Sequence, residues 1–217
     1  MTTQAQLASE VYVITNRADL AAETRVAIQK AIRKLHGADF WTRDLIRKRV
    51  VTGTDLIQPD PNSGRYTLDI HELAQFRKVS SLTYPLDVPL VPETIPPLYD
   101  TRYGGQFARE FKELAANDLI DSWRSEKENY FCIIGNEIHI RASWKVTQLD
   151  LTYWQWPVIT SNLDAQLGSW IASEYPEAIV EEACAAVFKM IGKDEEHGRF
   201  AALFTENLAI IRGTDIS

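Results

Sequence analysis

The chain has 217 residues, of which 45% are hydrophobic and 10% aromatic, values that are normal for a folded protein and exclude disorder of the whole. Its formal net charge of −7 argues against a sequence-specific nucleic-acid-binding protein, because such proteins usually carry a basic excess that neutralises phosphates. The two cysteines, Cys132 and Cys184, have no closely spaced partner, so we expect neither a disulfide framework nor a cysteine-rich metal site. The sequence has no basic and apolar leader and no apolar run of membrane-spanning length. We therefore expect a cytoplasmic origin and no membrane contact.

The first clear helical period begins near residue 19. Before it, the apolar residues 11–14 are compatible with either a short strand or an arm that packs on a neighbour. Asn16 or Asp19 can cap a helix that Gly37 ends. The inward stripe of this predicted helix recurs at three- and four-residue steps through Leu20, Thr24, Ile28, Ala31, Ile32 and Leu35.

Between residues 40 and 84 the hydrophobic period falls to two. Tyr66, Leu68 and Ile70 alternate with polar residues, and residues 59–64 are rich in turn formers, which together predict a hairpin. Residues 82–97 hold five of the nine prolines and predict an extended surface loop. Residues 107–123 return to helical spacing and predict one helix or two short ones, through Phe107, Phe111, Leu114, Leu119 and Ile120.

A second hairpin is predicted from residue 130. Two apolar stretches, residues 130–134 and 138–141, flank Gly135 and Asn136, which tolerate the positive φ of a tight turn. In residues 146–156, Leu149, Leu151 and Tyr153 fall on one face of a strand, and Pro157 ends its ladder.

The C-terminal third is predicted to be helical. A helix opens near Trp170 with Pro176 near its first turn, and Gly192 closes it. The next helix covers residues 194–211, closed by Gly213, with its apolar stripe at Phe200, Leu203, Phe204, Leu208 and Ile211.

The three main helices and four or five strands do not alternate as βαβ units, so we predict an α+β fold. Residues 15–37 and 168–212 would form a helical bundle. Residues 38–160 would form an inserted antiparallel β-domain with a short helical segment near 106–123, and residues 213–217 a C-terminal tail. We treat residues 1–217 as a single chain unit.

No catalytic, cofactor or metal motif stands out. The four histidines lack the spacings of zinc or iron sites, and no nucleophile elbow, phosphate loop or dinucleotide fingerprint occurs. We therefore expect no enzyme activity and no cofactor. A small α+β hydrolase remains the rival from a different class, and it would need the acids Glu72, Glu137 and Asp150 to converge.

Three groups of side chains are candidates for interactions. The basic cluster of Arg43, Arg47, Lys48 and Arg49 fits a solvated face or inter-subunit salt bridges better than DNA contact. The aromatic group of Trp144, Tyr153, Trp154, Trp156 and Trp170 fits an interface or a β-region packed on both faces. The acidic sets are Glu177, Glu181 and Glu182, then Asp194, Glu195 and Glu196; such acids are usually solvated helix faces.

The order of elements from residue 130 onward resembles the head-to-tail adaptor (connector) proteins of tailed bacteriophages. Their chains have a helix, a β-region with a hairpin, an aromatic strand that ends in proline, and a helix begun by Trp with a Pro-x-x-Ile/Leu pattern, so the likeness covers nearly the whole chain. The matching residues are Tyr130, Gly135, Ile138, Ile140, Arg141, Tyr153, Pro157, Trp170, Pro176 and Ile179. One departure is the absence of the usual proline after the second hairpin strand, where Arg141, Ala142 and Ser143 stand.

The resemblance implies a structural virion protein and a homo-oligomer, dodecameric in the family. Such a ring docks beneath the portal protein, offers a platform to the tail or nozzle protein, and lets double-stranded DNA pass without sequence-specific binding. The resemblance places the protein in the neck of the virion, and in the host cytoplasm before assembly. It also implies portal contacts by the terminal residues Arg212, Gly213, Thr214, Asp215, Ile216 and Ser217. Another neck or tail-completion protein, or a host regulatory binding module, are the remaining alternatives.

Overall fold

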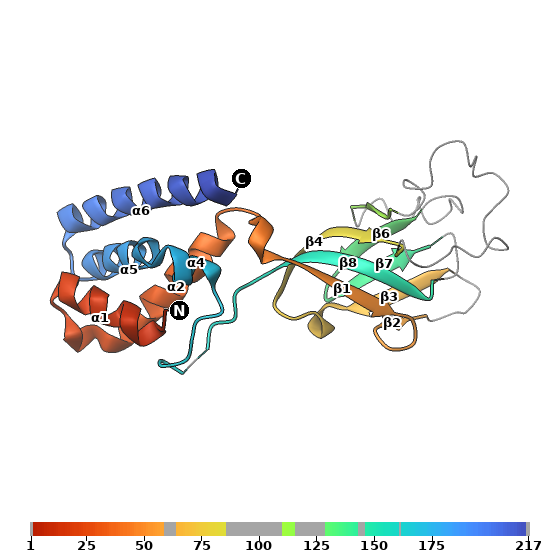
Figure 1. Cartoon of the computed structure of the whole chain (residues 1–217), viewed down its shortest axis with the longest axis horizontal. Coiled ribbons are helices and arrows are strands. Elements are labelled where there is room, and N and C mark those ends of the chain that lie inside the picture. The colour runs from red at the N-terminus through yellow and green to blue at the C-terminus, as the bar shows by residue number, and fades with distance from the viewer. Residues whose placement is uncertain are drawn as a thin grey trace. The chain divides into compact units, whose positions relative to one another are not determined.

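The computed structural model describes residues 2–58, 64–85, 110–115, 129–142, 146–160 and 162–215. The fold is α+β, as predicted, with helices from both parts of the chain and mainly antiparallel sheets between them in sequence. It comprises two compact units: a helical unit, Met1–Asp44 with Trp156–Ser217, and a β unit, Leu45–Gln155 (Figure 1). The sequence placed the inserted β-domain at residues 38–160, and the β unit runs from residue 45 to residue 155.

The helical unit is organised around one helix. Helix α5 (Pro176–Met190) contacts α1 (Gln4–Thr15), α2 (Ala21–Gly37), α4 (Trp170–Glu174) and α6 (Asp194–Asp215). The apolar faces of these helices form one core, and α6 runs along α5 on the side away from α1 (Figure 1). The side chains at the centre of this core include Leu7, Ile28, Leu35, Ile171, Ile179 and Ala183.

Helix α1 is an element that the sequence interpretation missed. Thr3 and Gln6 form a capping box, in which each side chain accepts a hydrogen bond from the other residue's backbone N–H. Leu7 and Val11 then fall on the same buried face, so residues 11–14 belong to a helix and not to a strand or an arm. Asn16 adopts the left-handed conformation at φ 53° and ends α1, so it does not cap the following helix.

Helix α2 has the buried face predicted for it, and α5 has the predicted proline in its first turn. Thr24, Ile28 and Leu35 are buried on α2, and Pro176 occupies the first turn of α5. The chain leaves α5 through Gly192 at φ 75°. Two details differ from prediction: the segment from Trp170 forms a separate short helix, and α6 continues through residue 213 instead of ending there.

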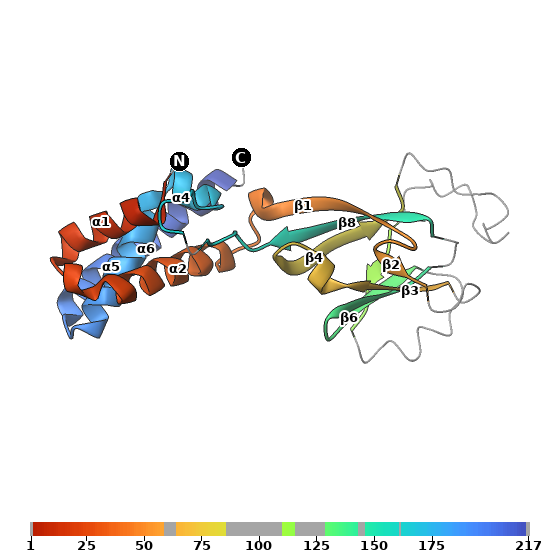
Figure 2. The ribbon, with the colours of Figure 1, turned by 90° about the horizontal axis from the view of Figure 1, so that it is seen from below.

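The β unit contains two sheets with one shared core. Strands β1 (Leu45–Val51), β8 (Gln148–Gln155) and β4 (Phe76–Thr83) form an antiparallel sheet in the order β1-β8-β4 (Figure 2). The second sheet has the order β2-β3-β7-β6-β5, with bounds Leu56–Ile57, Arg65–Asp69, Glu137–Arg141, Tyr130–Ile134 and Lys112–Glu113. The core includes Val50, Leu68, Leu82, Ile140 and Leu151, which come from both sheets.

The two predicted hairpins are present. Strands β6 and β7 pair around Gly135, which adopts φ 59° as a tight turn requires. Strands β2 and β3 pair in register Leu56↔Leu68. Of the turn predicted at residues 59–64, only Gly64 is among the described residues, and it adopts φ 60°. Strand β3 stops at Asp69, because Ile70–Glu72 forms a 3-10 turn that the Asp69 carboxylate caps.

The helix predicted over residues 107–123 is wrong where the structure describes it. Phe111 is buried, and the following strand β5 (Lys112–Glu113) runs parallel to β6. A non-local strand partner overrides the helical spacing here. The remainder of that segment lies outside the described residues. Most of the proline-rich segment does too, although Leu82 and Thr83 at its start belong to β4.

Candidate functional site

An acid, an imidazole and a hydroxyl meet inside the helical unit. Nδ1 of His36 lies 2.7 Å from Oδ2 of Asp44, and Nε2 of His36 lies 2.8 Å from Oγ of Ser169. The three residues are 1%, 4% and 4% exposed. The order carboxylate, imidazole, hydroxyl is the one that serine hydrolases use to activate a nucleophile.

Local structure explains why each residue is there. His36 belongs to the last turn of α2, and Asp44 ends the 3-10 turn Thr42–Asp44. Ser169 is the N-cap of α4, and its hydroxyl oxygen accepts a hydrogen bond from the backbone N–H of Ala172 at 3.1 Å. The hydroxyl is therefore already used in a cap and is closed off from solvent. In this arrangement the network ties three segments together and offers no access to a substrate carbonyl.

Trp170 completes the network and is occupied within the chain. Its indole N–H donates to Oδ1 of Asp44 at 2.9 Å, and the ring of Trp41 meets it edge-on at 5.9 Å. The guanidinium of Arg43 lies 4.5 Å from the centre of the Trp170 ring and forms a two-pronged ion pair with Glu174. Trp170, a candidate interaction residue, is thus bound to other segments of the helical unit.

The predicted terminal interaction residues also bind within the helical unit. Arg212 donates to the carbonyl of Ala38 at 3.0 Å, and the carboxylate of Asp215 accepts from both the backbone N–H and the hydroxyl of Thr42 at 2.9 Å. Thr214 shares a hydrogen bond with the Tyr175 hydroxyl at 3.0 Å. These contacts fasten the end of α6 to the segment that follows α2. Ile216 and Ser217 lie outside the described residues.

The remaining predicted tryptophans belong to different units. Trp154 lies half-buried on β8 in the β unit. Trp156 lies half-buried in the helical unit beside Gly37, where a Cβ would come within 3.5 Å of its ring. Trp144 lies outside the described residues.

The basic cluster is neutralised within the chain. Arg47 and Arg49 both bind the buried carboxylate of Asp150, with Arg49 at 2.8 Å, and Lys48 pairs with Asp55 at 3.1 Å. Hydrogen bonds from Arg49 and then Arg47 hold the pKa of Asp150 below its ordinary value. These ion pairs lie within the chain, whereas the sequence suggested a solvated face or salt bridges between subunits.

The acids required by the hydrolase alternative have other roles. Asp150 is held by two arginines, and Glu137 pairs with His139 at 3.1 Å on β7. Glu72 closes the 3-10 turn that follows β3. Within the residues that the structure describes, no group of three or more His, Cys, Asp or Glu side chains could hold a metal ion.

Both cysteines are buried thiols in separate units. Burial raises the pKa of Cys132. Burial, with a contribution from the nearby Glu181 charge, raises the pKa of Cys184 to about 12. A thiol that stays protonated at neutral pH is a poor nucleophile, so neither residue suits covalent catalysis.

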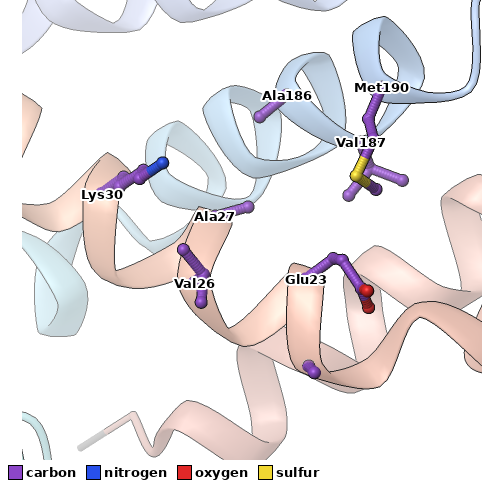
Figure 3. Close-up of a pocket in the computed structure, with 8 residues that line it drawn as sticks. Glu23, Val26, Ala27, Lys30, Ala186, Val187 and Met190 are labelled. Carbon is purple, nitrogen blue, oxygen red and sulfur yellow. The ribbon is translucent and has the colours of Figure 1, made fainter.

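A pocket on the helical unit was not anticipated from the sequence. It has a volume of about 370 Å³ and lies between α2 and α5 (Figure 3). Its lining is mostly apolar: Ala22, Val26, Ala27, Ala186, Val187 and Met190, with Glu23 and Lys30 among the labelled side chains. Val26 and Met190 are 48% and 52% exposed. The available signal was Val26, a large apolar residue between the charged residues Glu23 and Lys30 of α2.

No model of a known protein family matches the chain, and no curated protein matches its sequence. Among the helices of the described part, none is long and apolar enough to cross a bilayer.

Proposed function

We propose that this chain is a head-to-tail adaptor of a tailed bacteriophage, a structural subunit of a ring between the portal protein and the tail or nozzle protein. The observation that carries the proposal is the order of elements. A helical unit made from both parts of the chain carries an inserted β unit, in which a hairpin leads through an aromatic strand into a tryptophan-led helix. This is the order of the adaptor family described above.

The residues that carry the resemblance have roles that suit it. Gly135 turns the hairpin, and Pro157 follows the end of β8. Ser169 caps the helix that begins at Trp170, Pro176 opens α5, and Ile179 is fully buried. These are turn, cap and core positions, so they support a common architecture and not a shared chemistry.

The departure from the family pattern also has a structural account. Ala142 stands near where the family usually has proline after the second hairpin strand, and its backbone N–H donates to the carbonyl of Gly64 at 2.8 Å. Proline has no N–H to donate. In this chain the edge of the hairpin is extended by one further hydrogen bond to the segment that precedes β3.

The proposed work of the protein is binding without turnover, with no cofactor, in the neck of the virion. The ring would be dodecameric and would let double-stranded DNA pass. The net charge of −7 supports passage over retention, because like charges oppose phosphate binding. Another neck or tail-completion protein is the nearest alternative within the virion.

The proposal is tested by mixing the purified protein with the portal protein encoded beside its gene. We expect a mostly monomeric protein alone by light scattering, and closed rings stacked on the portal by electron microscopy. An unrelated ring-shaped oligomer of similar size serves as the control for non-specific stacking. Absence of binding to the portal, or a metabolic operon around the gene, would overturn the proposal.

A second candidate, an acyl hydrolase that uses Ser169, is favoured by one observation: the spacing of Asp44, His36 and Ser169. A fluorophosphonate probe separates the two candidates, because it labels only an activated and accessible serine. If the chain is an adaptor, the probe should label neither the parent protein nor the Ser169→Ala control. Labelling that disappears in Ser169→Ala would instead support the hydrolase.

A further inference from the structure

Two opposite charges mark the outer face of α2 at the pocket. Glu23 and Lys30 are seven residues apart, so they lie on the same side of the helix and about 10 Å apart along its axis. The exposed Val26 lies between them. Neither Glu23 nor Lys30 has an ion-pair partner within the part of the chain that the structure describes.

The outer face of α6 carries the same spacing with the charges reversed. Arg199 and Glu206 are also seven residues apart and exposed, with the small residue Ala202 between them. Neither has an ion-pair partner among the described residues. One turn further along, Ile210 is 55% exposed, although α6 buries Phe204 and Ile211 on its opposite face.

We infer that the outer face of α6 from one copy of this chain packs on the α2 pocket of a second copy. The two helices run parallel, with Arg199 facing Glu23 and Glu206 facing Lys30. Ala202 then lies over Val26, where its small side chain allows the helix axes to approach to about 8–10 Å. This contact would join neighbouring subunits of the ring, so the inference rests on the proposed function.

The charges determine the direction of the contact. In the antiparallel arrangement Arg199 would face Lys30 and Glu206 would face Glu23, which places like charges together. Exposed ion pairs contribute little free energy each, so these pairs select the register, while covering Val26 and Met190 supplies the driving force.

The proposed contact joins two different surfaces of the helical unit, since no residue of α6 lines the pocket. A contact of this heterologous type repeats from copy to copy and closes into a ring when the rotation allows. A symmetric dimer would require the same surface on both partners.

The first experiment captures the contact as a disulfide. In the variant Val26→Cys/Ala202→Cys, mild oxidation at high protein concentration should produce a ladder of dimers, trimers and higher species on non-reducing gels. The native cysteines are buried and are not expected to contribute. The single variants Val26→Cys and Ala202→Cys are the controls and should give no ladder. A double variant that remains monomeric, or single variants that form dimers as efficiently, would overturn the inference.

The second experiment tests the register by charge exchange in the double-cysteine background. Glu23→Arg with Lys30→Glu should lower the cross-linked fraction about tenfold, and adding Arg199→Glu with Glu206→Arg should restore it. All four sites are exposed, and circular dichroism checks that each variant is folded. An unchanged yield, or a loss without rescue, would overturn the register. If the protein binds the portal but gives no ladder, the α2–α6 contact is refuted and the adaptor proposal stands. If it gives a ladder but does not bind the portal, the adaptor proposal is refuted and the contact stands.

Discussion

The indole nitrogen of Trp170 donates a hydrogen bond to Oδ1 of Asp44 at 2.9 Å, and the other oxygen of the same carboxylate lies 2.7 Å from Nδ1 of His36. Asp44 is the last residue of the helical unit before the chain enters β1. One buried carboxylate therefore binds the end of α2 to the start of α4. The stability of the helical unit should depend on it more than on any of its exposed ion pairs.

Replacing Asp44 by Ala should lower the free energy of unfolding by about 3 kcal/mol, because the change leaves buried donors on His36 and Trp170 unpaired. Urea unfolding followed by circular dichroism measures the effect. Asp39→Ala, which removes an exposed ion pair with Arg212, is the matched control and should cost less than about 1 kcal/mol. An equal loss of unfolding free energy in the two variants would show that the buried network stabilises the protein no more than an exposed ion pair does.

Ile179→Asp and Ala183→Asp should each destabilise the protein by about 4 kcal/mol, because both positions are fully buried on α5 and would place an unpaired charge in the core. Thermal melts provide the measurement. Ala186→Asp introduces the same charge on the same helix at an exposed position and should melt within a few degrees of the parent. Core variants that melt like Ala186→Asp would contradict the packing of α5.

Glu181 should make stability increase toward acid pH. Burial raises the pKa of its carboxyl, the hydrogen bond from Asn207 lowers it, and the charges of Glu177 and Glu206 raise it further. Because the folded state then binds the proton more tightly than the unfolded state, the protonated form favours folding. Its benefit is complete below the unfolded pKa and is lost as the pH rises through the folded pKa.

Glu181→Gln should therefore melt at a higher temperature than the parent at pH 7, and the difference should shrink as the pH approaches 4. The exposed Glu177→Gln is the control, with a smaller shift at both pH values. A variant that is less stable at neutral pH would mean that the ionised carboxylate is favourable in the fold.

If the ring encloses the DNA channel, some of the acids on α5 and α6 should line it. Glu181 and Glu182 are half-buried and bind Asn207 and Lys34. Glu196 is also half-buried and lies 3.6 Å from Lys193, so the exposed members of the two acidic sets are Glu177, Asp194 and Glu195. Changing these three to Lys should leave rings intact and create DNA retention that weakens as salt is raised. Filter binding on rings verified by microscopy gives the answer. Retention that does not respond to salt would place these acids outside the channel.

Local patterns in the sequence predicted much of the fold. The three- and four-residue spacing of α2 and the Gly135 turn were sufficient, because each depends on residues close together in the chain. Helix α1 was predictable in principle from Thr3 and Gln6, but its apolar residues 11–14 read equally well as a strand. The strand at Lys112 was not predictable, because the strand with which it pairs, β6, begins at residue 130.

The candidate sites depended on contacts that no local pattern encodes. His36 and Ser169 are 133 positions apart, yet their side chains share a hydrogen bond. Asp215 similarly binds Thr42 across 173 positions. Trp170, Arg212, Thr214 and Asp215, which the sequence suggested as interaction residues, form hydrogen bonds with other segments of the helical unit.

Because the β unit is inserted between α2 and α5, the helices of one core are synthesised at widely separated times. Helix α2 ends at Gly37, but its packing partner α5 begins only at Pro176, after the entire β unit. During translation the apolar faces of α1 and α2, which include Leu7 and Ile28, lack the contacts of α5 until the intervening residues have emerged from the ribosome. In truncated products that stop before α5, these apolar faces would stay exposed to solvent. The helical unit therefore needs complete translation to be soluble.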